Sequence, residues 1–159
     1  NTTFVGQNLG AGKLDRVKKG VNIGILIAMA GTLIIVVPLM CFSDTMLKLF
    51  NSDPEVLRYG RMFVLYMSPF YIPYCATQIY SGALRGAGDS LSPMIVTIAS
   101  FVVFRQLYLL IGTQFISSPL FVGLSYPAGW IVSTITLFII YRSGRWEKKL
   151  PAHVRMQAA

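Results

Sequence analysis

The chain has 159 residues, of which 54% are hydrophobic and only 13% are charged, and its mean hydropathy is +0.60. This composition is too apolar for a water-soluble domain of that size. The net charge of +8 does not indicate a nucleic-acid partner, because the basic residues stand at the ends of apolar runs, as they do in membrane proteins.

The first segment is the glycine-rich stretch VGQNLGAGKLDRVKKG. It does not match a phosphate-binding loop: counting from Gly12, Gln7 stands where the first glycine is needed and Leu14 where Ser or Thr is needed. Residues 1–20 are instead predicted to be the end of a truncated helix and a basic cytoplasmic connector at the lipid headgroups. Gly10 and Gly12 are expected to be hinges or turns. We therefore expect the chain to be a piece of a longer protein.

Four apolar segments are long enough to cross a bilayer. The first has 22 residues without a charge, and a helix of that length spans roughly 33 Å. A soluble bundle would need polar faces on its outer helices, and the first and fourth segments have none. We predict an all-α membrane protein with four transmembrane helices, at residues 21–42, 61–84, 93–112 and 120–142.

The connections carry signals for helix ends. In the external interfacial segment, Ser43 is predicted to cap a short helix and Asp53 to cap the next, which begins with proline. In the following Gly loop, Gly86 and Gly88 are further candidate hinges, one of them left-handed. The predicted connections are the external segment 43–60, the cytoplasmic loop 85–92, the external loop 113–119 and the basic cytoplasmic tail 143–159.

Charge sets the expected orientation. Of the 14 Lys and Arg residues, ten fall on the side that holds both ends and the loop 85–92, and three fall on the other side. Loops rich in Lys and Arg stay in the cytoplasm. We predict an integral, multi-pass protein of the plasma (cytoplasmic) membrane, the inner membrane of a bacterial cell, with both ends of this piece cytoplasmic.

The second span carries a polar stripe. Tyr71, Tyr74, Gln78, Ser81 and Arg85 are spaced by three or four residues and so share one helical face. Polar groups facing lipid are costly, so the stripe is expected to face protein or a water-filled cavity. Tyr71, Tyr74 and Gln78 are predicted to line a substrate cavity; alternatively, the tyrosines only join helices.

Two prolines and one arginine complete the candidate residues. Pro69 and Pro73 are expected to kink the second span. Arg105, in the third span, costs on the order of 2.5–3.5 kcal/mol to insert. It is either a buried cation beside the cavity or a side chain that reaches the membrane surface.

Catalytic and metal chemistry are not expected. Cys41 and Cys75 lie in apolar segments, where a disulfide is not expected, and the single histidine, His153, is in the tail. No nucleophile–base pair or metal cluster is visible, so we predict no enzyme, no catalytic or metal site and no cofactor. The four spans contain no Asp or Glu, so any acid that couples transport to an ion lies outside this piece.

The ordered motifs VGQNLGAGKLDRVKKG, LFNSDPEVLRYG, SGALRGAGDSLSP and VVFRQLYLL resemble the multidrug and toxic compound extrusion (MATE) family. This resemblance implies two six-helix lobes around a central cavity, which export organic, often cationic drugs in exchange for H⁺ or Na⁺. The chain would be the end of helix eight plus helices nine to twelve, and its partners would be the missing N-terminal lobe, the bilayer and small organic substrates. Some members carry a carboxylate on the tenth helix; residues 61–84 do not.

Two alternatives remain open. A flippase for lipid-linked sugars or polysaccharide, from the same superfamily, would be expected to have more basic residues facing its cavity than Arg105 and Arg85. A non-transporting membrane fragment or accessory subunit is the other.

Overall fold

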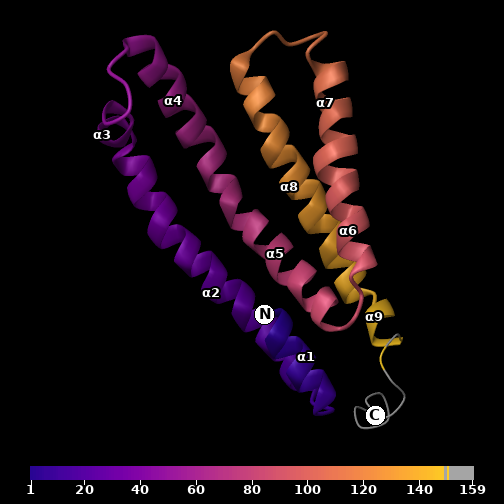
Figure 1. Ribbon diagram of the computed structural model, residues 1–159. Coiled ribbons are helices and arrows are strands. Elements are labelled where there is room, and N and C mark those ends of the chain that lie inside the picture. Colours follow the sequence, from indigo (N-terminus) through magenta and orange to yellow (C-terminus); the bar gives the residue numbers. More distant parts are fainter. Residues whose placement is uncertain (149, 151–159) are drawn as a thin grey trace.

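The computed structural model describes residues 1–148 and 150, and the elements in that part of the chain are all helical (Figure 1). The predicted all-α class is confirmed. The elements are α1 (Thr2–Gly10), α2 (Leu14–Cys41), α3 (Ser43–Lys48), α4 (Pro54–Met67), η1 (Ser68–Phe70), α5 (Tyr71–Gly86), α6 (Leu91–Ile98), η2 (Ala99–Phe104), α7 (Arg105–Gly112), α8 (Pro119–Arg142) and α9 (Arg145–Lys148).

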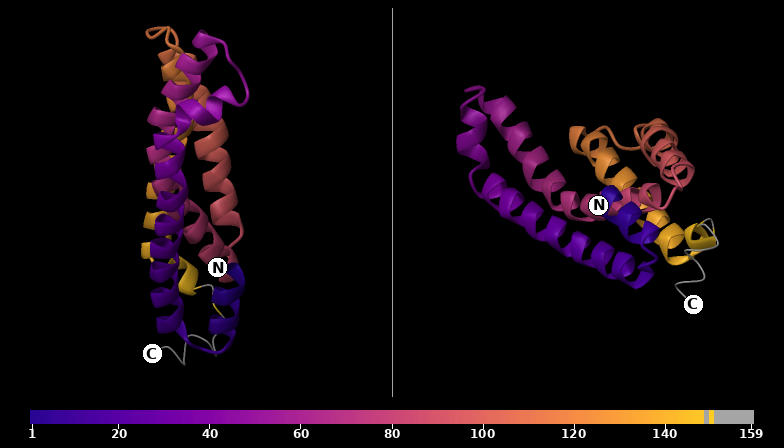
Figure 2. Two further views of the ribbon diagram at one scale, coloured as in Figure 1. Left: turned by 90° about the vertical axis from the view of Figure 1, so that its left-hand side faces the viewer. Right: turned by 60° about the horizontal axis from the view of Figure 1, so that its bottom comes forward.

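The helices form an elongated bundle in which α5 is central. It packs against α2 on one side and α8 on the other, while α1 packs on both α2 and α5. The continuous path α6–η2–α7 packs on α8. Helix α3 and the α7–α8 connection lie at one end of the bundle, and α1 and α9 lie toward the other (Figures 1 and 2).

Three helical stretches are long and apolar enough to cross a membrane: Leu14–Cys41, Leu91–Gly112 and Pro119–Arg142. They contain the third and fourth predicted spans and all of the first except Phe42. The second predicted span is built from α4, η1 and α5 in succession, so it is a segmented path rather than one long α-helix. Its division at Ser68–Phe70 coincides with Pro69, which cannot donate a backbone hydrogen bond.

The predicted basic connector is not a separate segment. Helix α2 begins at Leu14, seven residues before the predicted start of the span, so Arg16, Lys18 and Lys19 belong to its first turns. Lys and Arg are good helix formers, and Asp15 in the first turn suits the positive end of the helix dipole. The chain turns just before, at Gly12, whose φ is 71°.

The two predicted caps have different outcomes. Asp53 caps α4 as predicted: its carboxylate accepts the backbone N–H of Glu55 at 2.8 Å and that of Val56 at 3.4 Å. The prediction for Ser43 is wrong. Ser43 is buried and donates backwards to the carbonyl of Met40 at 3.0 Å, because α3 follows α2 with almost no break.

The Gly loop combines a turn with a close helix contact. Gly88 has φ 84°, a left-handed conformation that favours glycine. Gly86 ends α5 where α1 crosses it, and a Cβ added there would lie 2.6 Å from the carbonyl oxygen of Thr2. Gly10 ends α1 with open space around it. The turns are therefore observed, while movement about these glycines stays a prediction.

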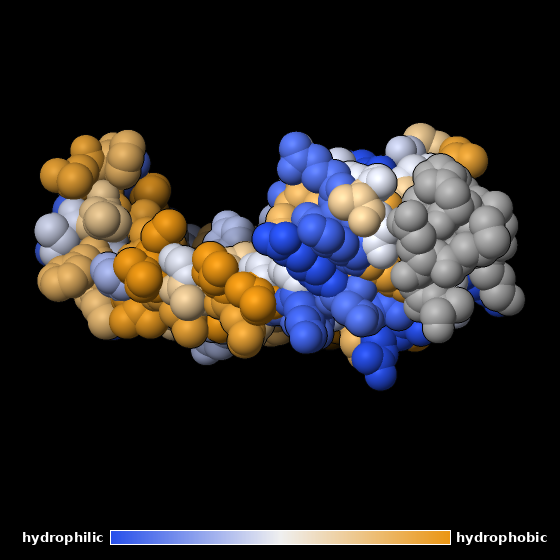
Figure 3. Space-filling model, turned by 90° about the horizontal axis from the view of Figure 1, so that it is seen from below, coloured by the Kyte–Doolittle hydropathy of each residue, from blue (hydrophilic) through white to orange (hydrophobic). Residues whose placement is uncertain are grey.

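The buried core lies toward the end of the bundle that holds α1 and α9. Val5, Val17, Val21, Leu84 and Leu137 are fully buried in one cluster. When the bundle is viewed from the end that holds α1 and α9, hydrophilic residues gather near the centre of the view, and the surface to the left is hydrophobic (Figure 3).

Of the predicted tail 143–159, the described part contains α9 and Leu150. The remainder, including Lys149, His153 and Arg155, lies outside the described residues.

Candidate functional site

The upper half of the polar stripe on α5 forms an aromatic cluster with α8. The ring centroids of Tyr71 and Tyr74 each lie 5.1 Å from that of Trp130. Tyr74 also lies 6.4 Å from Phe101 of η2. Gln78 donates from Nε2 to the Tyr74 hydroxyl at 2.6 Å. The structure therefore brings three of the four predicted cavity residues together: two tyrosines lie against an indole ring, and Gln78 is bonded to one of them.

Hydrogen bonds between α5 and α8 fix this cluster in place. Thr134 Oγ1 lies 2.9 Å from the carbonyl oxygen of Pro73 and 2.7 Å from Thr77 Oγ1. It also lies 2.7 Å from the carbonyl of Trp130, one turn away on its own helix. Hydroxyls joined in this way between two helices hold the helices in register. The hydrogen bonds of Thr134, one turn from Trp130, therefore set the position of the indole relative to the tyrosines.

The lower half of the stripe opens into a pocket. Ser81 and Arg85 line a space of about 240 Å³ between α5 and α6, together with Ser90, Pro93, Met94, Thr97 and Ile98. The stripe has both buried and accessible members: Ser81 is buried, whereas Tyr71, Gln78 and Arg85 are exposed. That the exposed part of the stripe faces a water-filled cavity stays a prediction.

Arg105 lies apart from the tyrosines and is held by α8. Its Nε donates to Ser125 Oγ at 3.2 Å, and its guanidinium carbon lies 3.8 Å from the centre of the Tyr126 ring. Ser125 is fully buried, and its hydroxyl donates a hydrogen bond to the carbonyl of Val122 at 2.6 Å. The cation therefore has a hydroxyl and an aromatic face as neighbours. Tyr126 is one helical turn from Trp130, so α8 links the two groups of contacts.

A π-helical segment positions both Phe101 and Arg105. η2 covers Ala99–Phe104, and Arg105 is the first residue after it. The wider turn lies against α8 at Gly129, where an added Cβ would be 3.1 Å from the carbonyl oxygen of Ser100. π-Helical turns inside α-helices occur frequently at functional sites.

Some residues of this cluster were not predicted from the sequence. Trp130, Ser125 and Tyr126 lie in the fourth span, which was read only as an apolar helix. The sequence offered one signal: Tyr126 and Trp130 are four residues apart, so they lie on the same face of a helix.

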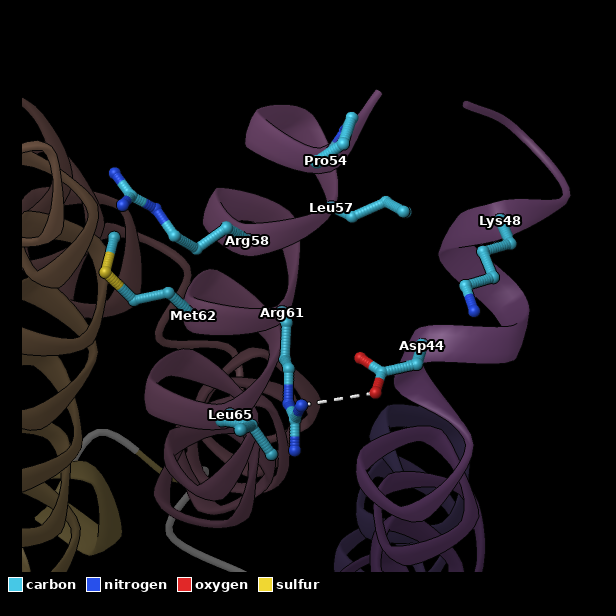
Figure 4. Close-up of a pocket in the computed structure, with 8 residues that line it drawn as sticks. All are labelled: Asp44, Lys48, Pro54, Leu57, Arg58, Arg61, Met62 and Leu65. Atoms are coloured by element: carbon cyan, nitrogen blue, oxygen red, sulfur yellow. Dashed lines mark ion pairs between the residues drawn. The ribbon is translucent and has the colours of Figure 1, made fainter. Parts of the chain in front are cut away.

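A second, larger pocket lies at the opposite end, between α3 and α4 (Figure 4). Its volume is about 500 Å³, and it contains an ion pair between Arg61 and Asp44 at 3.2 Å. Both side chains are more than half exposed, so the pair contributes little to stability. Among the residues that the structure describes, no group of three His, Cys, Asp or Glu side chains could hold a metal ion.

Comparison with known proteins gives consistent matches. The family model described as MatE matches residues 1–110. The chain is 24% identical over 149 residues to "Probable multidrug resistance protein NorM" of Thermotoga maritima, covering 93% of this chain and 32% of that protein. It is 26% identical over 145 residues to "Probable multidrug resistance protein YpnP" of Bacillus subtilis, covering 91% and 32%.

A third relative has a different name. The "FAD transporter" of Shewanella oneidensis is 26% identical over 100 residues, covering 63% of this chain and 22% of that protein. The chain spans about a third of the length of the first two relatives.

Proposed function

The chain belongs to the MatE family and is part of a multi-pass membrane protein, and from this premise we propose that the whole protein is a multidrug efflux antiporter. It exports organic, often cationic compounds in exchange for H⁺ or Na⁺ across the plasma membrane. It is a transporter and not an enzyme, it needs no cofactor, and this chain supplies most of its C-terminal lobe. The match of the family model to residues 1–110 is the observation that carries the proposal.

The aromatic cluster is the part of this chain that contacts the exported compound. Tyr71 and Tyr74 on α5 and Trp130 on α8 present their ring faces next to one another. The ring centroid of each tyrosine lies 5.1 Å from that of Trp130. Ring faces attract organic cations by about 0.5–2 kcal/mol each. Gln78 adds an amide next to the Tyr74 hydroxyl. Arg105, the first residue of α7, borders the cavity beside Tyr126, which lies one turn from Trp130 on α8, and its charge disfavours cations there.

The coupling ion binds outside this chain. The predicted spans hold no carboxylate, and a membrane-buried site for H⁺ or Na⁺ usually needs an ionisable or oxygen-rich group. The coupling site is therefore supplied by the other lobe or by the missing seventh helix, and the missing N-terminal lobe supplies the facing wall of the cavity. Both ends of this chain lie in the cytoplasm, in keeping with the ten basic residues on that side.

The experiment is dye efflux from cells that lack their own pumps and express the intact protein. Ethidium is the cation, and the Na⁺ and H⁺ gradients are collapsed separately to identify the ion. Tyr74→Ala and Trp130→Ala should each slow efflux about 2- to 30-fold, the range that one cation–π contact supplies. Tyr66→Ala is the control, because Tyr66 is exposed on α4 away from the stripe.

Two results would count against the proposal. If the unaltered protein does not lower ethidium accumulation, export of cationic drugs is wrong. A different substrate, such as a dinucleotide of the kind named for the Shewanella relative or a lipid-linked sugar, would then be tested by vesicle uptake. If efflux occurs but the two alanine variants match Tyr66→Ala, the transporter assignment stands and the aromatic cluster is not part of the cavity.

A further inference from the structure

A small pocket at the end of the bundle near α9 has a different chemistry from the stripe. It has a volume of about 240 Å³ and is lined by residues of α2, α5, α8 and α9. Seen from below, hydrophilic residues gather at this end (Figure 3). No residue of the aromatic cluster around Trp130 lines it.

Stacked aromatic rings form one wall of the pocket. Tyr141 and Trp146 are stacked, with centroids 5.4 Å apart and planes 11° apart, and Tyr80 lies 5.2 Å from Tyr141. Trp146 is 2% exposed, and its Nε1 donates to the carbonyl of Tyr141 at 2.9 Å. The turn between α8 and α9 is thereby fixed, and this wall is rigid.

The polar groups of the lining are mainly hydrogen-bond donors. Lys18 and Arg142 bring two positive charges, and Glu147 brings the only carboxylate in the lining. That carboxylate is already engaged by Lys18 Nζ at 2.9 Å. The Tyr141 hydroxyl is buried and has no hydrogen-bond partner among the described residues. An anion would match one net positive charge and an unused hydroxyl donor.

The pocket borders an exposed apolar side of α8. Phe138 lines it and is 45% exposed, and the nearby Ile139 is 59% exposed. The basic residues of the first turns of α2 lie at the same end. A headgroup in the pocket would therefore have an apolar surface beside it for its acyl chains.

We propose that this pocket binds a phosphate group, presented by an anionic lipid of the adjacent leaflet. Arg142 and the Tyr141 hydroxyl are the direct contacts, and Lys18 adds charge while it holds Glu147. The same chemistry fits free inorganic phosphate, and the experiment separates the two sources. The proposal stands apart from drug export, since it needs only that the helices lie in a membrane.

The test is native mass spectrometry of the intact protein in detergent, stripped of lipid and titrated in turn with phosphatidylglycerol, phosphatidylcholine and inorganic phosphate. One phosphatidylglycerol per protein should be retained in preference to phosphatidylcholine. Arg142→Gln should weaken its retention about tenfold or more, because a charged hydrogen bond is lost. Tyr141→Phe keeps the stacked ring and should weaken it about 2- to 10-fold.

Arg145→Gln is the matched control. It removes the same charge from the same end of the protein, but Arg145 does not line the pocket. Loss of phosphatidylglycerol in the two pocket variants and not in the control supports a lipid site. Retention of inorganic phosphate alone, lost in the same variants, supports a phosphate site with a soluble ligand. The proposal is overturned if neither ligand is retained, or if the control weakens retention as much as Arg142→Gln does.

Discussion

Replacing Gly86 with alanine should loosen the contact between α1 and α5. The added Cβ would lie 2.6 Å from the carbonyl oxygen of Thr2 and 2.8 Å from Cβ of Val5. The first of these atoms belongs to the backbone, so the clash is relieved only if α1 shifts as a unit. Overpacking of this kind costs about 1–3 kcal/mol. Val5 and Leu9, which are almost fully buried, would lose part of their packing as α1 moves.

A graded set of glycine variants tests this reasoning. The free energy of unfolding would be measured in mixed micelles by titration with a denaturing detergent. Gly10→Ala should cost nothing, because no atom lies within 4 Å of its added Cβ. Gly6→Ala should cost little, since its nearest atom is the Gly86 carbonyl oxygen at an ordinary 3.5 Å. If Gly86→Ala were as stable as Gly10→Ala, the packing described for α1 would be wrong.

Three further predictions concern single contacts, and each is measured by the same unfolding titration. Thr134→Val should lower the free energy of unfolding by about 1–3 kcal/mol, because Thr77 loses its hydroxyl partner. Thr136→Val breaks only a hydrogen bond within α8 and should lower it less. Equal losses in the two variants would contradict the bridge between α5 and α8. Tyr126→Leu should cost about 0.5–2 kcal/mol through loss of the contact with Arg105, and Tyr126→Phe should keep most of it; identical losses would exclude a cation–π interaction. Asp53→Ala should cost about 0.5–2 kcal/mol and Asp53→Asn much less, unless the cap of α4 is irrelevant to stability.

Features that depend on a short stretch of chain could be predicted from the sequence. The apolar runs gave three of the spans, since a helix in lipid must satisfy its backbone internally and expose apolar side chains. Asp53 followed by proline identified the start of α4, and the glycines Gly86 and Gly88 identified the end of α5, where Gly88 makes a left-handed turn. The start of α2 was placed too late, because basic residues were read as a connector although they are good helix formers.

Contacts between distant segments could not be predicted in this way. Periodicity placed Tyr71, Tyr74 and Gln78 on one face of α5, but it could not identify Trp130 as the residue they meet. The partners of Arg105 lie on α8 and depend on how two helices pack. The π-helical turn of η2 contains no proline or glycine that would have signalled it.

Labelling of a cysteine at position 74 tests most directly whether the stripe faces water inside a transporter. The native Cys41 and Cys75 are first replaced by alanine, since Cys75 neighbours the probed position. In the intact protein, the Tyr74→Cys variant should react with a water-soluble thiol reagent, and a cationic substrate should slow that reaction. A Leu84→Cys variant, at a fully buried position of the same helix, should stay unlabelled. If the Tyr74→Cys variant stays as unreactive as the Leu84→Cys variant in every combination of substrate and ion gradient, the stripe does not line a water-filled cavity.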